Sequence, residues 1–216
     1  MLGGLATAGL IVIYLPLCDG MGNQVIYGIG EELLKLSLKY DPVNKIPECW
    51  QSESQLEKRM EDRYRVVYNP HLFVIAAEEL LLAEGVEIIF DSVVTNVKMR
   101  DSEIENLTIH NKSGDVVINA KTFVDATGDA DLCALSGENT AVYKENRLAS
   151  WNYVYDGEKL LLNALAIPYN SPIKEGESVY NGIDYMHITQ SILDSRQMLK
   201  QDLLKRRESK PEAMPA

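Results

Sequence analysis

The chain has 216 residues, of which 46% are hydrophobic, so it can bury the core of one domain or of one domain with a smaller lobe. Its 21 Lys and Arg residues against 32 Asp and Glu residues give a net charge of -11, which argues against nucleic acid or an anionic membrane surface as partner. The cysteines Cys18, Cys49 and Cys133 are widely spaced and form no C-x-x-C pair. This spacing indicates reduced thiols in a cytoplasmic protein and argues against a metal site.

The N-terminal stretch of residues 2–17 is apolar and contains several glycines. A signal peptide or a membrane span is the alternative interpretation, but no Lys or Arg precedes the apolar run, and Pro16 interrupts it. The run is also short for crossing a bilayer. A buried strand or loop beside a cofactor is therefore the preferred prediction, because closely spaced glycines let the backbone turn tightly or approach another group.

Two helices are predicted in the next part of the chain. Glu31 and Glu32 open the first, a run of leucines gives it an apolar face, and Asp41-Pro42 ends it. A polar and charged segment follows. Asn69-Pro70 then supplies an N-cap and a first-turn proline for the second helix, which Gly85 ends.

The apolar segment Val86–Phe90 follows this second helix and is predicted as a short buried strand. A helix, one glycine and an apolar strand together make an α/β crossover unit. This order indicates a parallel sheet.

Three further runs have strand character: Val93–Met99, Ile104–His110 and Val116–Ala120. Turn-forming residues separate them, so an antiparallel β-meander is predicted over about residues 92–120. The meander leads directly into Thr122–Ala126, which is predicted as another strand. The meander is therefore expected to be an insertion between two strands of a larger sheet.

The segment Val124–Asp131, with the sequence VDATGDAD, is the most informative part of the chain. It predicts a strand that breaks at Gly128 into a tight turn and then begins a helix. Such a junction can hold a nucleotide, because glycine permits close approach and a helix N-terminus offers unpaired N–H groups. An ordinary strand-to-helix turn capped by aspartate is the alternative.

The C-terminal part combines strand-like aromatic residues, an irregular stretch and a final amphipathic helix over about residues 188–207. One face of that helix is predicted to carry Ile188, Ile192, Leu199 and Leu203. Tyr143, Trp151, Tyr153, Tyr155 and His187 also lie in this part of the chain. Because alternating aromatic residues in a strand usually serve packing, no catalytic residue is assigned.

Four segments follow one another along the chain: Gly3–Gly9, the crossover helix, the meander and Asp125–Asp131. In this order they resemble the FAD-dependent oxidoreductases with a glutathione-reductase-like FAD-binding fold. Fumarate reductase and glycine oxidase are relatives in that superfamily. The resemblance implies an α/β fold: a partial Rossmann-like parallel sheet that binds FAD, with the antiparallel β-meander inserted and a second, smaller α+β lobe. It places a partial FAD-binding domain at residues 1–140 and a partial substrate or cap lobe, ending in the C-terminal helix, at residues 141–216. The candidates to line that substrate lobe are Tyr143, Trp151, Tyr153, Tyr155 and His187.

The resemblance also implies FAD as the cofactor and a set of residues that contact it. These residues are Gly3, Gly4, Ala6, Thr7, Gly9, Val94, Ala126, Thr127, Gly128 and Asp129. The first four would lie near the pyrophosphate and ribityl chain, with Gly9 toward the flavin. The strand end at residues 126–128 would pack over the ADP half, with Asp129 ordering the helix start, and Val94 would offer main-chain groups to adenine.

The chain departs from the family pattern at its beginning. A strand, a G-x-G-x-x-G turn, a helix and a second strand, about thirty residues in all, would stand before Gly3 in the family. The chain therefore resembles the middle of a flavoenzyme: a truncated gene product, an excised domain or a subunit completed by a partner. The sheet edge exposed in this way predicts a homo-oligomer or a partner chain.

The sequence leaves three hypotheses for function. The first is an FAD-dependent oxidoreductase, or a truncated part of one, that transfers hydride or electrons between a small-molecule substrate and flavin. The second is a non-catalytic fragment or interaction module that keeps the family fold without binding FAD on its own. The third is a different nucleotide-using enzyme, such as a transferase, that uses the turn at Gly128 for phosphate.

Overall fold

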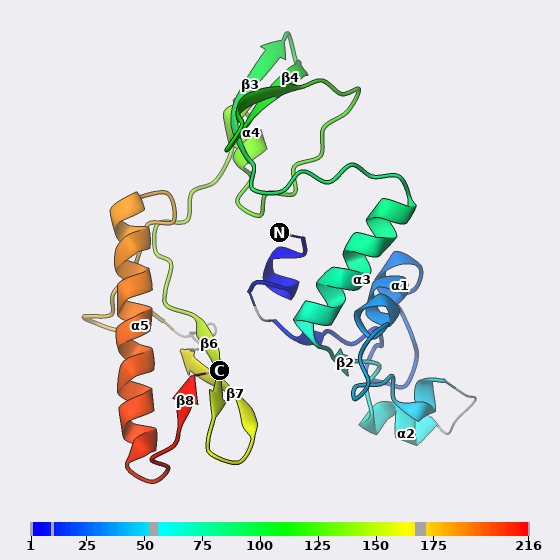
Figure 1. The fold of residues 1–216 in the computed structure, drawn as a ribbon, viewed down its shortest axis with the longest axis vertical. Helices are drawn as coiled ribbons and strands as arrows, with labels where there is room; N and C mark the ends of the chain where they lie inside the picture. Colours follow the sequence, from blue (N-terminus) through cyan, green and yellow to red (C-terminus); the bar gives the residue numbers. More distant parts are fainter. Residues whose placement is uncertain (1, 10, 52–55, 167–171, 216) are drawn as a thin grey trace. The chain divides into compact units, whose positions relative to one another are not determined.

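The computed structural model describes residues 2–9, 11–51, 56–166 and 172–215 (Figure 1). The chain divides into two compact units. Unit 1 contains Met1–Val93 and Asn111–Ser113, and unit 2 contains Val94–His110 and Gly114–Ala216. We describe each unit by itself.

Unit 1 is mainly helical. Its elements are η1 (Gly4–Ala6), β1 (Ile13–Tyr14), α1 (Ile29–Ser37), η2 (Glu48–Trp50), α2 (Leu56–Glu61), β2 (Val66–Val67) and α3 (Pro70–Ala83). Strands β1 and β2 pair antiparallel, with Ile13 opposite Val67, and α1 packs against α3. The two helices predicted from the sequence are α1 and α3, and both are confirmed.

Helix α3 begins where the sequence predicts. The Asn69 side chain accepts hydrogen bonds from the backbone amides of His71 at 2.9 Å and Leu72 at 3.3 Å, and Pro70 occupies the first turn. Gly85 follows the helix with a φ of 75°, a conformation that favours glycine. Local capping chemistry therefore sets both ends of this helix.

The core of unit 1 forms around α1. Leu17, Leu34, Tyr64 and Val66 are buried there, and the rings of Trp50 and Tyr64 stack with their centroids 5.1 Å apart. The Tyr64 hydroxyl donates to the Glu31 carboxylate at 3.2 Å. Burial, together with that carboxylate, raises the pKa of Tyr64 to about 12.

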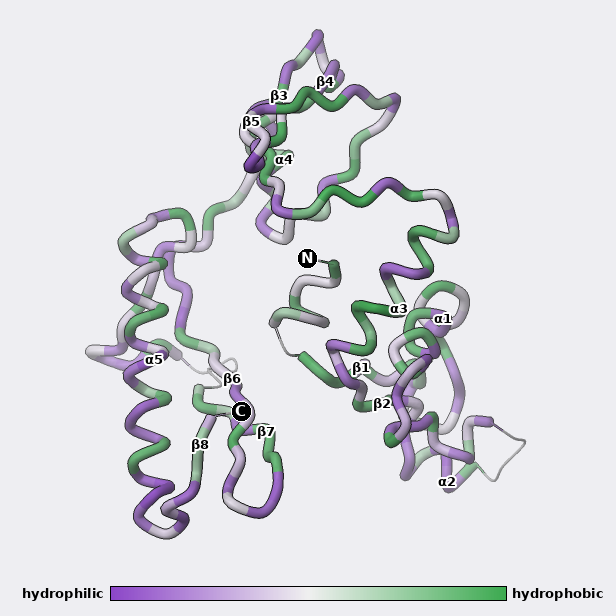
Figure 2. Tube along the Cα trace, viewed as in Figure 1, coloured by the Kyte–Doolittle hydropathy of each residue, from purple (hydrophilic) through white to green (hydrophobic). Residues whose placement is uncertain are grey.

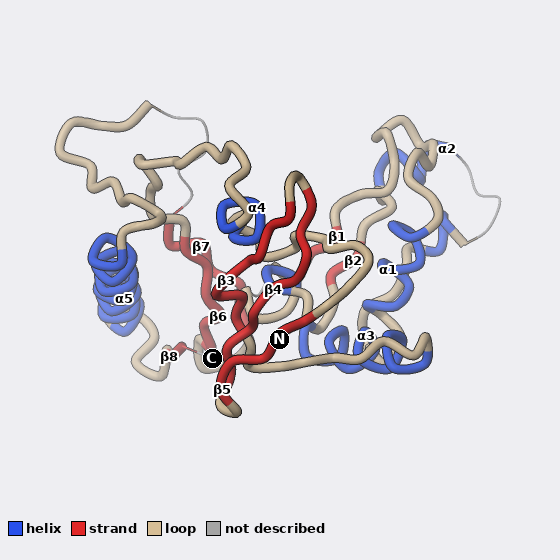
Figure 3. The backbone as a smooth tube through the Cα atoms, turned by 90° about the horizontal axis from the view of Figure 1, so that it is seen from above, coloured by secondary structure: helices blue, strands red, loops and turns tan. Residues whose placement is uncertain are grey.

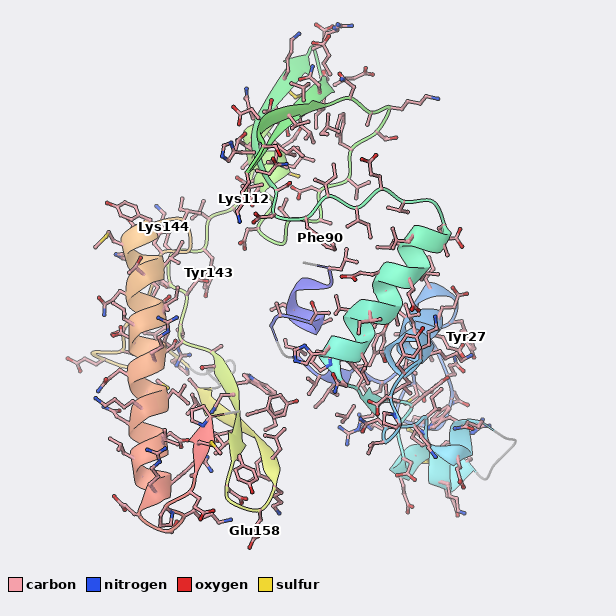
Figure 4. The ribbon with its side chains drawn as sticks, in the orientation of Figure 1. Tyr27, Phe90, Lys112, Tyr143, Lys144 and Glu158 are labelled. Carbon is pink, nitrogen blue, oxygen red and sulfur yellow. The ribbon has the colours of Figure 1, made fainter. Side chains whose placement is uncertain are left out.

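The predicted strand Val86–Phe90 is wrong for this structure. The segment between α3 and β3 is loop (Figure 3), and Phe90, labelled in Figure 4, is 49% exposed. A strand needs a neighbouring strand to satisfy its backbone hydrogen bonds. Among the described residues, no segment pairs with this one.

The meander lies where the sequence predicts it. Strands β3 (Val93–Arg100), β4 (Glu103–Asn111) and β5 (Gly114–Ile118) form a three-stranded sheet in the order β3-β4-β5. Two-residue connections join consecutive strands, so the sheet is antiparallel. Helix α4 (Asp131–Leu135) packs its buried Leu132 against Leu107 and Ile109 of β4.

The segment Thr122–Ala126, also predicted as a strand, is irregular. Its residue Val124 is 85% exposed, whereas Phe123 packs against the cluster of β4 and α4. All strand pairs in the described parts of the chain are antiparallel. The structure is thus a mixed α/β fold with several antiparallel sheets, and its described residues do not show the predicted parallel sheet.

The C-terminal part of unit 2 contains a second three-stranded sheet and a long helix. Strands β6 (Ser150–Tyr155), β7 (Leu160–Ala166) and β8 (Met214–Pro215) pair in the order β7-β6-β8. Helix α5 (Tyr185–Arg207) begins at Asp184, whose side chain caps it by accepting two backbone amides. The predicted C-terminal helix is therefore confirmed.

Helix α5 is mostly hydrophilic, whereas α3 is rich in hydrophobic residues (Figure 2). Its predicted apolar face is only partly correct, because Leu199 and Leu203 are half-buried while Ile188 and Ile192 are exposed. Polar contacts also link α5 to the sheet: Asn163 of β7 donates to the Asp202 carboxylate at 3.1 Å.

We expect Leu34→Ala to lower the free energy of unfolding of unit 1 by about 2–5 kcal/mol, because a fully buried leucine leaves a cavity. The exposed Leu82 on α3 provides the control, and Leu82→Ala is expected to change stability by less than about 0.5 kcal/mol. Urea unfolding followed by tryptophan fluorescence measures both changes. Equal losses for the two variants would contradict the core described here.

Candidate functional site

The N-terminal glycine segment of unit 1 folds as a tight 3-10 turn, not as a strand. Gly3 and Gly4 have φ values of 82° and 45°, and the Ala6 amide donates to the Gly3 carbonyl at 2.9 Å. A Cβ added to Gly9 would lie 2.7 Å from Leu5 Cα, so only glycine fits there. A Cβ added to Gly4 would meet no atom within 4 Å.

The Tyr68 side chain holds this segment through hydrogen bonds to its backbone. Its side chain is buried, and its hydroxyl lies 2.9 Å from the carbonyl oxygen of Ala6 and 2.6 Å from that of Ile11. Its ring packs edge-on against Phe73 of α3. A residue 62 positions from Ala6 therefore fixes the glycine turn, and the sequence analysis did not identify it.

The second candidate segment lies in unit 2, where Asp125 organises the turn before α4. One carboxylate oxygen accepts the Thr127 amide at 3.0 Å and the Thr127 hydroxyl at 2.8 Å. The other oxygen accepts the Cys133 amide at 3.0 Å. Thr127 in turn accepts the Asp131 amide at 2.9 Å. These bonds fix the turn and cap α4 at the same time.

The same hydrogen bonds set the electrostatics of the turn. The backbone amides of Thr127 and Cys133 hold the pKa of Asp125 well below its usual range. The Asp125 carboxylate in turn raises the pKa of the Cys133 thiol. Since the thiolate is the nucleophilic form of cysteine, this environment makes Cys133 a poor nucleophile.

The middle of the turn exposes main-chain donors. Gly128 and Ala130 have φ values of 95° and 59°. Among the described residues, no group accepts a hydrogen bond from the amides of Gly128, Asp129 or Ala130. Gly128 and Ala130 also line a shallow hollow of about 370 Å³. Consecutive exposed amides of this kind can bind an anionic oxygen or a ribose hydroxyl.

The predicted site residues are distributed over both units. Ala126, Thr127, Gly128 and Asp129 share the turn in unit 2, whereas Gly3, Gly4, Ala6, Thr7 and Gly9 share the glycine segment in unit 1. Val94 lies in β3 and packs its side chain against the cluster of β4 and α4.

The two threonines of the predicted site have their hydroxyls occupied within the protein. Thr7 is buried, and its hydroxyl donates to the Leu2 carbonyl, while the Thr127 hydroxyl is held by Asp125. In the turn of unit 2, the groups that remain for a ligand are therefore backbone amides, whereas in the glycine segment the amides of Ala6, Thr7 and Gly9 already donate to the carbonyls of Gly3 and Gly4.

A cavity with a volume of about 510 Å³ lies beside α5 in unit 2. None of the five candidate substrate-lobe residues lines it. Tyr143, labelled in Figure 4, is 71% exposed on the segment before β6, and His187 Nδ1 accepts the Asn181 amide at 2.9 Å. The cavity walls come instead from Arg147, the segment 177–180 and α5.

The described residues show neither a membrane-spanning helix nor a metal-binding group of side chains. The described helices include none that is both long enough and apolar enough to span a bilayer. In the same residues, no three His, Cys, Asp or Glu side chains come together in a group that could hold a metal ion.

Comparison with protein-family models matches residues 1–151 to the family described as FAD dependent oxidoreductase. The match covers more than half of the chain and includes both the glycine segment and the Asp125 turn. The same comparison with curated proteins and with solved structures finds no match. Strand β7, helix α5 and strand β8 lie beyond the matched residues.

Removing the Asp125 carboxylate is expected to loosen the turn. In Asp125→Ala, the amides of Thr127 and Cys133 should exchange with solvent at least about fivefold faster, the effect of losing one net hydrogen bond. Hydrogen exchange followed by NMR measures this change. Asp115→Ala, which removes an exposed carboxylate on β5, is the control, and faster exchange of these two amides in that variant as well would contradict the assignment.

The effect of pH on this turn follows from the lowered pKa of Asp125. A carboxyl group whose pKa is lower in the folded state stabilises that state fully above the ordinary pKa of 3.8, and this stabilisation is lost as the pH falls further. The Thr127 amide should therefore stay protected from neutral pH down to that value. Loss of protection well above it would contradict the proposed cap.

Proposed function

The chain belongs to the FAD dependent oxidoreductase family, and from this premise we propose that it binds FAD and transfers hydride or electrons between a small-molecule substrate and the flavin. FAD is the cofactor of this family. The observation that carries the proposal is the Asp125 turn, where three consecutive amides lack a partner among the described residues. This arrangement suits the oxygens of a nucleotide.

Both glycine-containing segments fit FAD through their backbones. At Gly4 and Gly128, a side chain would meet no protein atom within 4 Å, so a phosphate or ribose can approach the main chain closely. We propose that Gly3, Gly4, Ala6 and Thr7 lie near the pyrophosphate and ribityl chain, with Gly9 toward the flavin. Tyr68 and Asp125 would then act as positioning residues that hold the two segments.

The other contacts proposed for FAD come from the turn and from β3. Ala126, Thr127 and Gly128 would cover the ADP half, and Asp129 would order the start of α4. Strand β3 is an edge strand of its sheet, so the main-chain groups on its outer side have no strand partner. This supports the proposal that Val94 offers main-chain groups to adenine.

When bound, FAD supplies the electron-accepting chemistry, and this chain contributes binding and orientation. The hydrogen bond of Tyr68 to the Ala6 carbonyl holds the glycine segment, and the lowered pKa of Asp125 keeps its carboxylate ionised at neutral pH while it holds the turn in unit 2. Such preorganised donors bind an anion without having to rearrange. No side chain is assigned to proton transfer.

We further propose the division into a partial FAD-binding domain at residues 1–140 and a partial substrate or cap lobe at residues 141–216. The Rossmann-like parallel sheet of the first domain would use Val86–Phe90 and Thr122–Ala126 as strands once a neighbouring strand pairs with them. A cytoplasmic location is proposed because the three cysteines are free thiols.

One observation favours the second candidate function, an interaction module that does not bind FAD on its own. Val86 and Phe90 in one unit and Val124 in the other are apolar, lie on irregular backbone and are at least 43% exposed. Extended apolar segments can pair with a strand of another molecule. A homo-oligomer or a partner chain would supply that strand.

An FAD titration tests the proposed function. The anisotropy of flavin fluorescence should rise as FAD binds, and Gly128→Val should weaken binding by at least about tenfold, because a side chain blocks access to the amides. Gly176→Val is the matched control, since Gly176 also has a positive φ and open space around it. We expect this variant to bind FAD like the parent chain.

Two results would contradict the proposal. If the parent chain leaves the flavin signal unchanged, autonomous FAD binding is excluded and the interaction module is favoured. If both valine variants weaken binding equally, the effect comes from backbone strain and not from the turn.

A further inference from the structure

The cavity beside α5 lies largely outside the residues that match the family. It has a volume of about 510 Å³, within the range of about 300–1,000 Å³ typical of small-molecule sites. Eight of its ten lining residues follow residue 151, where the family match ends. The match therefore assigns no ligand to this cavity.

A fixed hydrogen-bond network forms one wall of the cavity. The buried Tyr180 donates its hydroxyl to an Asp194 carboxylate oxygen at 2.7 Å, and the Gln190 amide donates to the other oxygen at 2.8 Å. Tyr180 is itself held by a two-way backbone pairing with Asn146. These contacts place the Asp194 carboxylate at a defined position in the wall.

Arg147 carries the positive charge among the described lining residues, and a carboxylate of the same cavity balances it. Arg147 contacts the Glu177 carboxylate through Nε at 2.5 Å and through Nη2 at 2.9 Å, and both side chains are mostly buried. This pair leaves the Asp194 carboxylate as the uncompensated charge among the lining residues. An anionic ligand would face two carboxylates, whereas a cation would complement Asp194.

The other walls are neutral. Gln197 and Gln201 of α5 provide amide oxygens that can accept hydrogen bonds, while Leu148, Ala166 and Met198 provide apolar surface. A ligand that carries N–H donors on a short hydrocarbon chain would satisfy both kinds of surface.

We propose that this cavity binds a small organic ammonium ion, with the ammonium group at Asp194 and the glutamine amides and the hydrocarbon chain against Met198. A bare metal ion is not the expected ligand, because the described residues contain no group of three metal-ligating carboxylate, thiol or imidazole side chains. The site goes beyond the proposed function, and its test requires no FAD.

Binding can be measured with three probes of similar size: butylammonium, butanol and butyrate. With the methionine methyl groups labelled with ¹³C, the Met198 signal reports on the cavity, and the signals of Met99 and Met186 serve as references. We expect the Met198 signal to shift with butylammonium at about tenfold lower concentration than with butanol, and not with butyrate. The two reference signals should not move.

Asp194→Asn should remove the preference for butylammonium over butanol, since the amide oxygen can still accept the Tyr180 hydroxyl but carries no charge. Glu158→Gln makes the same change in net charge on the β6–β7 hairpin (Figure 4) and should keep the preference. Gln197→Leu, at an exposed position of α5, leaves Asp194 in place and should weaken butylammonium binding by about fivefold.

Three results would overturn the proposal: equal affinity for butylammonium and butanol, a shift of all methionine signals together, or a preference that survives Asp194→Asn. The second of these would indicate attraction of a cation to an acidic surface without a defined site.

Discussion

The fold depends on one constraint, that extended backbone becomes a strand only when another strand satisfies its hydrogen bonds. Val86–Phe90 and Thr122–Ala126 are apolar and flank the meander, yet neither pairs with a described segment. The turn at Gly128 does not need such a neighbour, because Asp125 holds it from within. The proposed nucleotide-binding turn is therefore held in place although the described residues do not show the parallel sheet that the family pattern implies.

The sequence could predict the elements that local contacts fix, but not those that depend on a distant partner. The start of α3 at Asn69, the meander and the C-terminal helix were predicted correctly, because capping side chains and short turns determine them locally. The two strands were predicted wrongly, because an apolar run does not reveal whether a partner strand is present. Tyr68 was missed for a related reason: its contact with Ala6 spans 62 positions, which no local pattern encodes.

The structure shows which groups of the predicted site residues are occupied within the protein. Thr7 and Thr127 stand in the predicted segments, but their hydroxyls serve the protein's own backbone and Asp125. Asp125 itself has a signal in the sequence, since an aspartate two residues before a threonine is typical of a side chain that closes a turn. The groups of the Asp125 turn that are proposed to hold FAD are the amides of Gly128, Asp129 and Ala130. The cavity at Asp194, by contrast, is built from side chains that no motif distinguishes.

The central claim is that the backbone amides of the Asp125 turn bind FAD. Hydrogen exchange of the chain with and without FAD, resolved by residue with NMR, tests it most directly. If the turn binds FAD, the amides of Gly128, Asp129 and Ala130 exchange freely without FAD and become protected when FAD is added. Unchanged exchange at these three amides while FAD is bound would show that the cofactor contacts the chain elsewhere and would contradict the account.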